Sequence, residues 1–239
     1  MIFAGVLAGG KGTRMGIQDM PKQFLMLGSK PIIVHTIEKF LFVPQIDQVI
    51  VAVHPDWTAH FEDLVNRYLA DHAGRLQVVD GGGERSDSIM NVITYLKERY
   101  DISEQDFLIT HDAVRPFLSY RTIVDNIQAM ERYAMVDTVV MANDTIVESE
   151  DGQQITTIPN RKHMFLGQTP QTFGILNYER LYQDLTAEEK MLLTDACKVF
   201  VLRGKSVGLV RGEYSNIKIT TVTDLKIAEA MLGEISSDK

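Results

Sequence analysis

Short apolar stretches alternate with helical patterns along most of this chain, and that alternation constrains the fold more than any other feature. Residues 2–7, 48–53 and 107–110 have the composition of buried strands, and 31–42 carries apolar side chains at helical spacing. Strands that alternate with helices are typical of an α/β fold whose sheet is covered on both faces. Further strands are expected at 76–79 and 136–142, and further helices at 56–69, 87–100 and 122–133.

The stretch from residue 143 to 173 interrupts the alternation. Two short extended segments at 145–149 and 154–158 flank the turn dipeptide Asp151-Gly152, which is the pattern of a β-hairpin. We interpret 143–173 as a β-arm that projects from a single domain spanning residues 1–239. Helices at 176–185, 187–200 and 223–232 and strands at 206–210 and 217–221 are expected to complete the chain.

Charge and cysteine content restrict the partners. Of the 239 residues, 24 are Lys or Arg and 32 are Asp or Glu, so the formal net charge is −8. This balance disfavours nucleic acids and membrane surfaces, because both are bound through clustered positive charge. The single cysteine, Cys197, excludes an intramolecular disulfide and a cysteine-based zinc site. We expect a cytoplasmic protein that acts on small molecules, with Cys197 as a core thiol.

A glycine-rich loop follows the first predicted strand. Three glycines stand within four positions and positive charge surrounds them, the residues being Gly9, Gly10, Lys11, Gly12, Thr13 and Arg14. Glycines let the backbone approach a ligand closely and present its N–H groups to phosphate oxygens. Lys22, between Pro21 and Gln23, adds another cation nearby. The pattern favours a phosphate-rich ligand over a plain glycine-rich turn with solvated charges.

Two common phosphate-binding motifs do not fit this loop. A dinucleotide-binding fingerprint requires a third glycine where Met15 stands, and Pro21 follows too soon for the helix that the motif needs. A P-loop requires a hydroxyl for Mg²⁺ where Gly12 stands. The third interpretation is a nucleotidyltransferase loop, in which the chain wraps a nucleoside triphosphate and a lysine, here Lys22, follows.

A second glycine run, at 81–83, follows the third predicted strand. Its backbone can approach a planar base, and the hydroxyl of Ser88 can read the edge of that base. The alternative interpretation is a helix N-cap at Ser86 or Asp87. Because ligands bind at the carboxyl ends of strands in open α/β sheets, this loop and the first one are expected at one edge.

A third loop, His111 to Pro116, carries a candidate metal ligand. Asp112 stands at the end of a buried strand, where a carboxylate is well placed to bind Mg²⁺. The alternative is a structural ion pair with Arg115, because a buried carboxylate requires a partner. His111 is expected to have a structural or supporting role.

The motifs L-A-G-G-x-G-T-R-M-G, P-K-Q-F and H-D-A-x-R-P occur in this order, and in this the chain resembles the sugar-phosphate and polyol-phosphate cytidylyltransferases. The resemblance covers nearly the whole chain. I-P-N-R, G-Q-T-P-Q-T-F and T-D-A-C-K resemble the ribitol-5-phosphate group most, followed by the 2-C-methyl-D-erythritol 4-phosphate group. The resemblance to this family implies a Rossmann-like nucleotidyltransferase fold, CTP as substrate and Mg²⁺ as cofactor. It also implies a homodimer whose subunits contact each other through the arm.

The resemblance also implies roles for individual residues. The positions that match nucleotide contacts are Leu7, Ala8, Gly9, Gly10, Gly12, Thr13, Gly81, Gly82, Arg85, Ser88 and Ala113. Those that match catalytic cations are Arg14, Lys22 and Lys218, and Asp112 matches the Mg²⁺ ligand. Those that match acceptor contacts are Arg115, Thr145, Arg161, Thr169 and Thr194. Thr145 and Arg161 would reach the partner subunit's site from the arm.

The implied reaction is transfer of a cytidylyl group from CTP to D-ribitol 5-phosphate, which gives CDP-ribitol and pyrophosphate for teichoic-acid synthesis. Two alternatives stay open. One is the same reaction with 2-C-methyl-D-erythritol 4-phosphate as the acceptor, and the other is a nucleotide-binding module without turnover.

Overall fold

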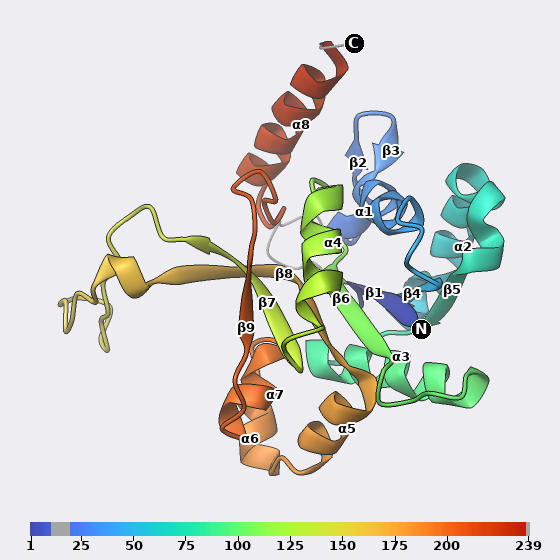
Figure 1. Ribbon diagram of the computed structural model, residues 1–239. Coiled ribbons are helices and arrows are strands. Elements are labelled where there is room, and N and C mark those ends of the chain that lie inside the picture. Colours follow the sequence, from blue (N-terminus) through green and yellow to red (C-terminus); the bar gives the residue numbers. More distant parts are fainter. Residues whose placement is uncertain (11–19, 238–239) are drawn as a thin grey trace.

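The computed structural model describes residues 1–10 and 20–237, and a seven-stranded sheet forms its centre (Figure 1). The strands are β1 (Ile2–Ala8), β4 (Gln48–Val53), β5 (Leu76–Asp80), β6 (Phe107–Asp112), β7 (Met135–Met141), β8 (Phe165–Gly174) and β9 (Gly208–Arg211). Their order is β5-β4-β1-β6-β8-β7-β9. All neighbouring pairs are parallel except the two that involve β8, which runs antiparallel to β6 and β7.

Helices cover both faces of this sheet. They are α1 (Ile32–Leu41), α2 (Thr58–Tyr68), α3 (Arg85–Arg99), α4 (Tyr120–Ala129), α5 (Ile175–Gln183), α6 (Ala187–Met191), α7 (Cys197–Leu202) and α8 (Val222–Ser237). One core cluster joins α1, α2 and α4 to the sheet, and a second joins α3, α5 and α7 to its other face. The predicted α/β fold, with a mostly parallel sheet covered on both faces, is confirmed.

The apolar spacing along α1 shows how the sequence builds this core. Ile33, Ile37 and Phe40 recur at helical intervals, and none of the three is exposed to solvent. Pro31 stands just before the helix, where its missing N–H removes no intrahelical hydrogen bond. Burial of each such side chain contributes about 1.5–3 kcal/mol to folding, so this face fixes α1 on the sheet.

Smaller elements complete the fold. A two-stranded sheet, β2 (Met26–Leu27) with β3 (Lys30–Pro31), lies beside α8. Short 3₁₀ helices occur at η2 (Lys22–Phe24), η3 (Pro55–Trp57), η4 (Ala70–Arg75) and η5 (Arg161–His163). A satellite cluster that includes Leu27, Ile219 and Ala228 attaches α8 to the main body.

Strand β8 was not expected from the sequence. Its residues fall largely within the predicted arm of 143–173, yet β8 lies inside the sheet between β6 and β7. Pro170 in the middle of β8 has no N–H for a ladder, which argues against a central strand. The sheet accommodates it where the β7–β8 register shifts between Asp137 and Val139, and the Thr138 hydroxyl donates to the carbonyl of Pro170 at 2.7 Å.

The remaining part of the interruption does leave the sheet as an arm between β7 and β8 (Figure 1, yellow). A single β-bridge pairs Glu148 with Thr157 within it, so the expected hairpin is present with minimal pairing. Val147, Ile155 and Ile158 on the arm are each more than half exposed. The arm therefore presents apolar side chains to solvent.

Two other predicted elements are wrong. The helix expected at 187–200 is split into α6 and α7, because the carboxylate of Asp195 accepts from the Lys198 N–H and starts a new helix. The strand expected at 217–221 is irregular chain, which the Ile219 N–H anchors to the carbonyl of Val114 at 2.9 Å. The first departure leaves Thr194 and Asp195 in irregular chain, and the second leaves Lys218 there.

Arg75 closes the end of α1, and this gives a test of the fold. Its two Nη groups donate to the carbonyl of Leu41 (2.9 Å), the last residue of α1, and to those of Val43 (3.3 Å) and Ile46 (2.6 Å) in the loop that follows. Arg75→Leu should lower the free energy of unfolding by about 2–3 kcal/mol, measured by urea denaturation. The exposed Arg67→Leu should change it by less than about 0.5 kcal/mol. Equal losses in both variants would contradict this role.

Candidate active site

The carboxyl ends of three strands bring the three predicted loops to one edge of the sheet. Leu7 of β1 lies beside Asp112 of β6, Ala8 beside Val53 of β4, and Val53 beside Asp80 of β5. A cavity opens at this edge, and all three loops line it. The predicted site residues that line it are Leu7, Ala8, Gly9, Gly10, Lys22, Gly82, Arg85, Ser88, Asp112, Ala113 and Lys218.

The two glycine loops touch each other backbone to backbone. A Cβ on Gly81 would stand 2.8 Å from the Cα of Gly9, and a Cβ on Gly82 would stand 2.1 Å from the Cβ of Asp87. Side chains are therefore excluded at both positions. The buried hydroxyl of Ser88 accepts from the Gly82 N–H at 3.0 Å, so it holds this loop as well as lining the cavity.

Helix α3 begins earlier than the N-cap proposed at Ser86 or Asp87. Glu84 is the N-cap, and the Asp87 carboxylate accepts from the Glu84 N–H at 3.0 Å in a capping box. Arg85 is the first residue of the helix, and its side chain lines the cavity. The same local sequence thus caps a helix and places a cation at the site.

Gln23 is a site residue that the sequence did not single out. It is buried, and its Nε2 donates to the carbonyls of Ala8 (2.7 Å) and Gly10 (3.1 Å), the two ends of the described part of the first glycine loop. The next residue, Phe24, stacks on Trp57 with ring centroids 5.4 Å apart. Trp57 is the only tryptophan of the chain, so its fluorescence can report on this region.

Three cations surround the carboxylate of Asp112. Lys218 Nζ lies 2.9 Å from Oδ2, Arg115 Nε lies 3.4 Å from Oδ2, and Arg85 Nε lies 3.5 Å from Oδ1. Burial by itself would raise the pKa of this carboxyl, but the charges of the three cations outweigh it and hold the pKa well below its usual range. The expected pair with Arg115 is present, and the cluster carries excess positive charge.

A buried hydrogen-bond chain fixes the backbone at Asp112. The Asp112 N–H donates to Thr169 Oγ1 at 3.2 Å, Thr169 Oγ1 lies 2.9 Å from His111 Nδ1, and His111 Nε2 lies 3.1 Å from the carbonyl of Arg115. A carbonyl only accepts, so Nε2 carries the proton and Nδ1 accepts from the threonine. Burial lowers the pKa of His111 to about 4, which keeps the ring neutral. His111 has the supporting role that was expected.

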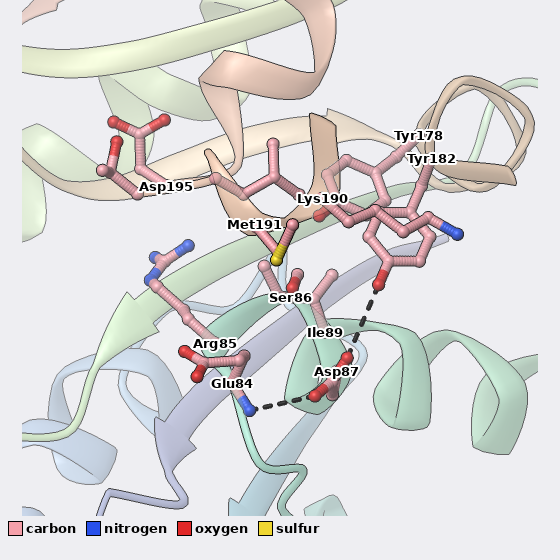
Figure 2. A pocket seen from close by; sticks show the side chains of 12 residues that line it. Glu84, Arg85, Ser86, Asp87, Ile89, Tyr178, Tyr182, Lys190, Met191 and Asp195 are labelled. Atoms are coloured by element: carbon pink, nitrogen blue, oxygen red, sulfur yellow. Dashed lines mark hydrogen bonds between the residues drawn. The ribbon is translucent and has the colours of Figure 1, made fainter. Parts of the chain in front are cut away.

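A second cavity of about 410 Å³ adjoins the first, within the range of small-molecule sites (Figure 2). It lies between the first turn of α3 and the segment 190–195. Thr194 and Asp195 belong to its lining, and Asp195 lies across it from Arg85. The two cavities share Glu84 and Arg85. Among the described residues, no hydrogen-bond partner meets Nη1 or Nη2 of Arg85 or the hydroxyl of Tyr178, although these atoms are buried.

The five predicted acceptor residues, all within the described part of the chain, do not line the first cavity. Arg115 is buried beneath Asp112, Thr169 is buried with its hydroxyl engaged, and Thr194 lines the second cavity. Thr145 and Arg161 lie on the exposed arm, where Arg161 Nη1 donates to the carbonyl of Asn143 at 2.8 Å. Lys11, Gly12, Thr13 and Arg14 fall outside the described residues.

Known proteins share both the sequence and this architecture. The model of the 2-C-methyl-D-erythritol 4-phosphate cytidylyltransferase family matches residues 2–234. A curated ribitol-5-phosphate cytidylyltransferase from Streptococcus pneumoniae serotype 2 is 55% identical over 232 residues, which cover 97% of this chain and 99% of that protein.

Solved structures agree. The 4-diphosphocytidyl-2C-methyl-D-erythritol synthase from Anaerococcus prevotii has a TM-score of 0.80 at 27% identity, with 98% of this chain and 96% of that one covered. The 2-C-methyl-D-erythritol 4-phosphate cytidylyltransferase from Francisella tularensis shares the fold, with a TM-score of 0.77 at 24% identity and coverage of 96% and 99%. Fold and site thus define a nucleotidyltransferase. The chain belongs to the 2-C-methyl-D-erythritol 4-phosphate cytidylyltransferase family, so the resemblance and the Rossmann-like fold are confirmed.

The contacts of Gln23 give a test of the nucleotide side of the site. Gln23→Leu keeps the volume but leaves the carbonyls of Ala8 and Gly10 without their donor, which loosens the first glycine loop. The dissociation constant for CTP, followed by Trp57 fluorescence, should rise about tenfold. Gln128→Leu, at an exposed position on α4, should leave the dissociation constant for CTP within about twofold of the original value. Unaltered CTP binding in Gln23→Leu would refute this role.

Proposed function

We propose that the protein transfers a cytidylyl group from CTP to D-ribitol 5-phosphate and releases pyrophosphate, as a step of teichoic-acid synthesis. The observation that carries the proposal is the cationic cluster of Arg85, Arg115 and Lys218 around Asp112, at a cavity lined by two glycine loops and Lys22. Relatives at 55% identity over nearly the whole chain are ribitol-5-phosphate cytidylyltransferases, which supports this acceptor.

Charge repulsion is the main obstacle to such a reaction, because both substrates are anions. At an effective dielectric constant near 20, two unit charges about 4 Å apart repel each other by roughly 4 kcal/mol. Fixed cations at the point of contact remove this penalty before the substrates meet. Lys22 and Lys218 line the cavity, and Arg85 stands at the boundary with the second cavity.

The chemistry requires positioning more than it requires a base. A phosphate monoester with a second pKa near 6 is already a nucleophile at neutral pH. Its oxygen attacks the α-phosphorus of CTP in line, the bond to the bridging oxygen breaks, and pyrophosphate leaves. Lys22, with Arg14 by resemblance, offsets the charge on the α-phosphate and the leaving group. Lys218 and Arg85, now paired with Asp112, are available to the phosphates.

The donor set at Asp112 fits Mg²⁺ that arrives with the triphosphate. Within residues 1–10 and 20–237, no group of three or more acidic, histidine or cysteine side chains could hold a metal alone. Mg²⁺ is commonly held by one or two carboxylates together with substrate phosphates, and Asp112 supplies one carboxylate at the cavity. When bound there, Mg²⁺ would neutralise charge on the phosphates.

The second cavity suits the polyol part of the acceptor. Thr194 and Asp195 add polar side chains to its lining, and Asp195 lies across the cavity from Arg85 (Figure 2). Arg85 and Tyr178 also line it, and among the described residues no partner meets the buried Nη groups of Arg85 or the buried hydroxyl of Tyr178. A chain of hydroxyl groups can donate to and accept from such a lining. The position of Arg85 between the two cavities would place the acceptor phosphate next to the nucleotide.

Assembly and location complete the proposal. The exposed apolar side chains of Val147, Ile155 and Ile158 support a homodimer in which the arm carries Thr145 and Arg161 to the partner subunit's site. None of the helices described is long and apolar enough to cross a bilayer. We place the enzyme in the cytoplasm, where its substrates are small molecules and neither nucleic acid nor membrane is a partner.

Removal of the Lys22 amine tests the catalytic site. Lys22→Ala should lower kcat for pyrophosphate release by about 100-fold or more, because a fixed positive charge next to the reacting phosphates is lost. The melting temperature should stay within about 2 °C of the original, since the residue lies in a short turn at the cavity. The exposed Lys226→Ala on α8 is the matched control and should keep full activity. Near-normal turnover in Lys22→Ala would overturn the assignment.

The acceptor is tested directly with CTP and two polyol phosphates. Pyrophosphate release should show a kcat/KM for D-ribitol 5-phosphate at least about tenfold above that for 2-C-methyl-D-erythritol 4-phosphate. The opposite ratio would assign the protein to isoprenoid synthesis. Tight CTP binding without pyrophosphate release from either acceptor would identify a nucleotide-binding module instead.

A further inference from the structure

Gln171 is a buried side chain whose hydrogen bonds link the sheet to the wall of the second cavity. It lies on β8, is 1% exposed, and its Nε2 donates to Asp137 Oδ1 on β7 at 3.0 Å and to Cys197 Sγ at 3.2 Å. Its Oε1 accepts from the Ala196 N–H at 3.2 Å. The amide therefore uses both of its ends, and all partners lie on β7 or at the start of α7.

The segment between α6 and α7 depends on these contacts. Residues 192–196 have no regular secondary structure, so hydrogen bonds from outside a helix must hold them. Gln171 fixes the end of the segment at Ala196, and Asp195 Oδ1 accepts from the Lys198 N–H at 3.0 Å. Thr194 and Asp195 of this segment line the second cavity, and Asp195 lies across it from Arg85 (Figure 2).

We propose that Gln171 is a positioning residue for the acceptor. It holds Thr194 and Asp195 at the distance from Arg85 that the polyol chain of the acceptor requires, and it does not touch the acceptor itself. The proposal rests on the proposed function, because it assumes that the acceptor occupies the second cavity. Gln171 lines neither that cavity nor the first, so it acts on the wall through its contacts with Ala196 and Cys197.

The same strand supplies a matched control. Thr172, the next residue, is also fully buried and also donates a side-chain hydrogen bond, from its Oγ1 to Asn126 Oδ1 at 3.0 Å. Asn126 belongs to α4, which packs on the opposite face of the sheet from α7. Thr172→Val thus removes a buried hydrogen bond from β8 without altering the cavity wall.

The first measurement is steady-state kinetics with CTP and D-ribitol 5-phosphate. Gln171→Leu should raise KM for the acceptor about tenfold and leave KM for CTP within about twofold, because only the acceptor wall moves. Thr172→Val should leave both KM values within about twofold. Equal rises in both KM values for Gln171→Leu, or unchanged KM values with only a lower melting temperature, would overturn the proposal.

A double variant that exchanges the donor and the acceptor between positions 137 and 171 should restore the contact. It also serves as the second test if Gln171→Leu folds poorly. In the double variant Asp137→Asn/Gln171→Glu, the new amide donates to the new carboxylate, whose other oxygen still accepts from Ala196. KM for the acceptor should return to within about threefold of the original value. A double variant as impaired as Gln171→Glu alone would count against positioning through this contact.

Hydrogen exchange separates failure of this proposal from failure of the proposed function. The backbone amides of 192–198 should exchange about tenfold faster in Gln171→Leu than in the original protein, with no substrate present. Unchanged exchange there would overturn the positioning role whatever the acceptor is. Original protein that releases no pyrophosphate with D-ribitol 5-phosphate would overturn the proposed function, and the exchange result, which needs no acceptor, would still show whether Gln171 holds this segment.

Discussion

The buried carboxylate of Asp112 and its three cations determine how the site is built. A carboxylate at the end of a central strand requires partners, and this chain supplies Arg85, Arg115 and Lys218 from three separate segments. The partners exceed the single negative charge, so a fold with a net charge of −8 holds a locally positive cavity. Local surplus, and not the total charge, determines which ligands this surface attracts.

Hydrogen bonds from strand β8 support this arrangement. The Thr169 hydroxyl accepts from the Asp112 N–H. The side-chain amide of Asn216 donates to the backbone carbonyl of Thr169 at 2.8 Å, and the backbone carbonyl of Asn216 accepts from Arg115 at 2.9 Å. Lys218 stands two residues after Asn216, so the same contacts fix the backbone from which the Lys218 side chain extends. An antiparallel strand between β6 and β7 thereby supports segments that are distant in the sequence.

The sequence predicts the parts of the molecule that depend on local patterns. The strands that end at Ala8, Asp80 and Asp112 follow from apolar runs, and the glycine loops after them follow from composition, so the first cavity could be anticipated. Strand β8 could not, because Pro170 and its polar neighbours conceal a central strand whose register shift exists only in the folded sheet. The role of Gln23 was missed for a related reason: its partners are carbonyl groups, which no side-chain pattern reveals.

The boundary between the two cavities has a consequence for divergence within the family. Within the described part of the chain, Glu84 and Arg85 are the only residues that line both the cavity at the glycine loops and the cavity at the segment 190–195. Substitutions in the wall that carries Thr194 can therefore accumulate without disturbing the glycine loops. Such a division suits a fold whose members differ in the alcohol that their names print, ribitol in one relative and 2-C-methyl-D-erythritol in another.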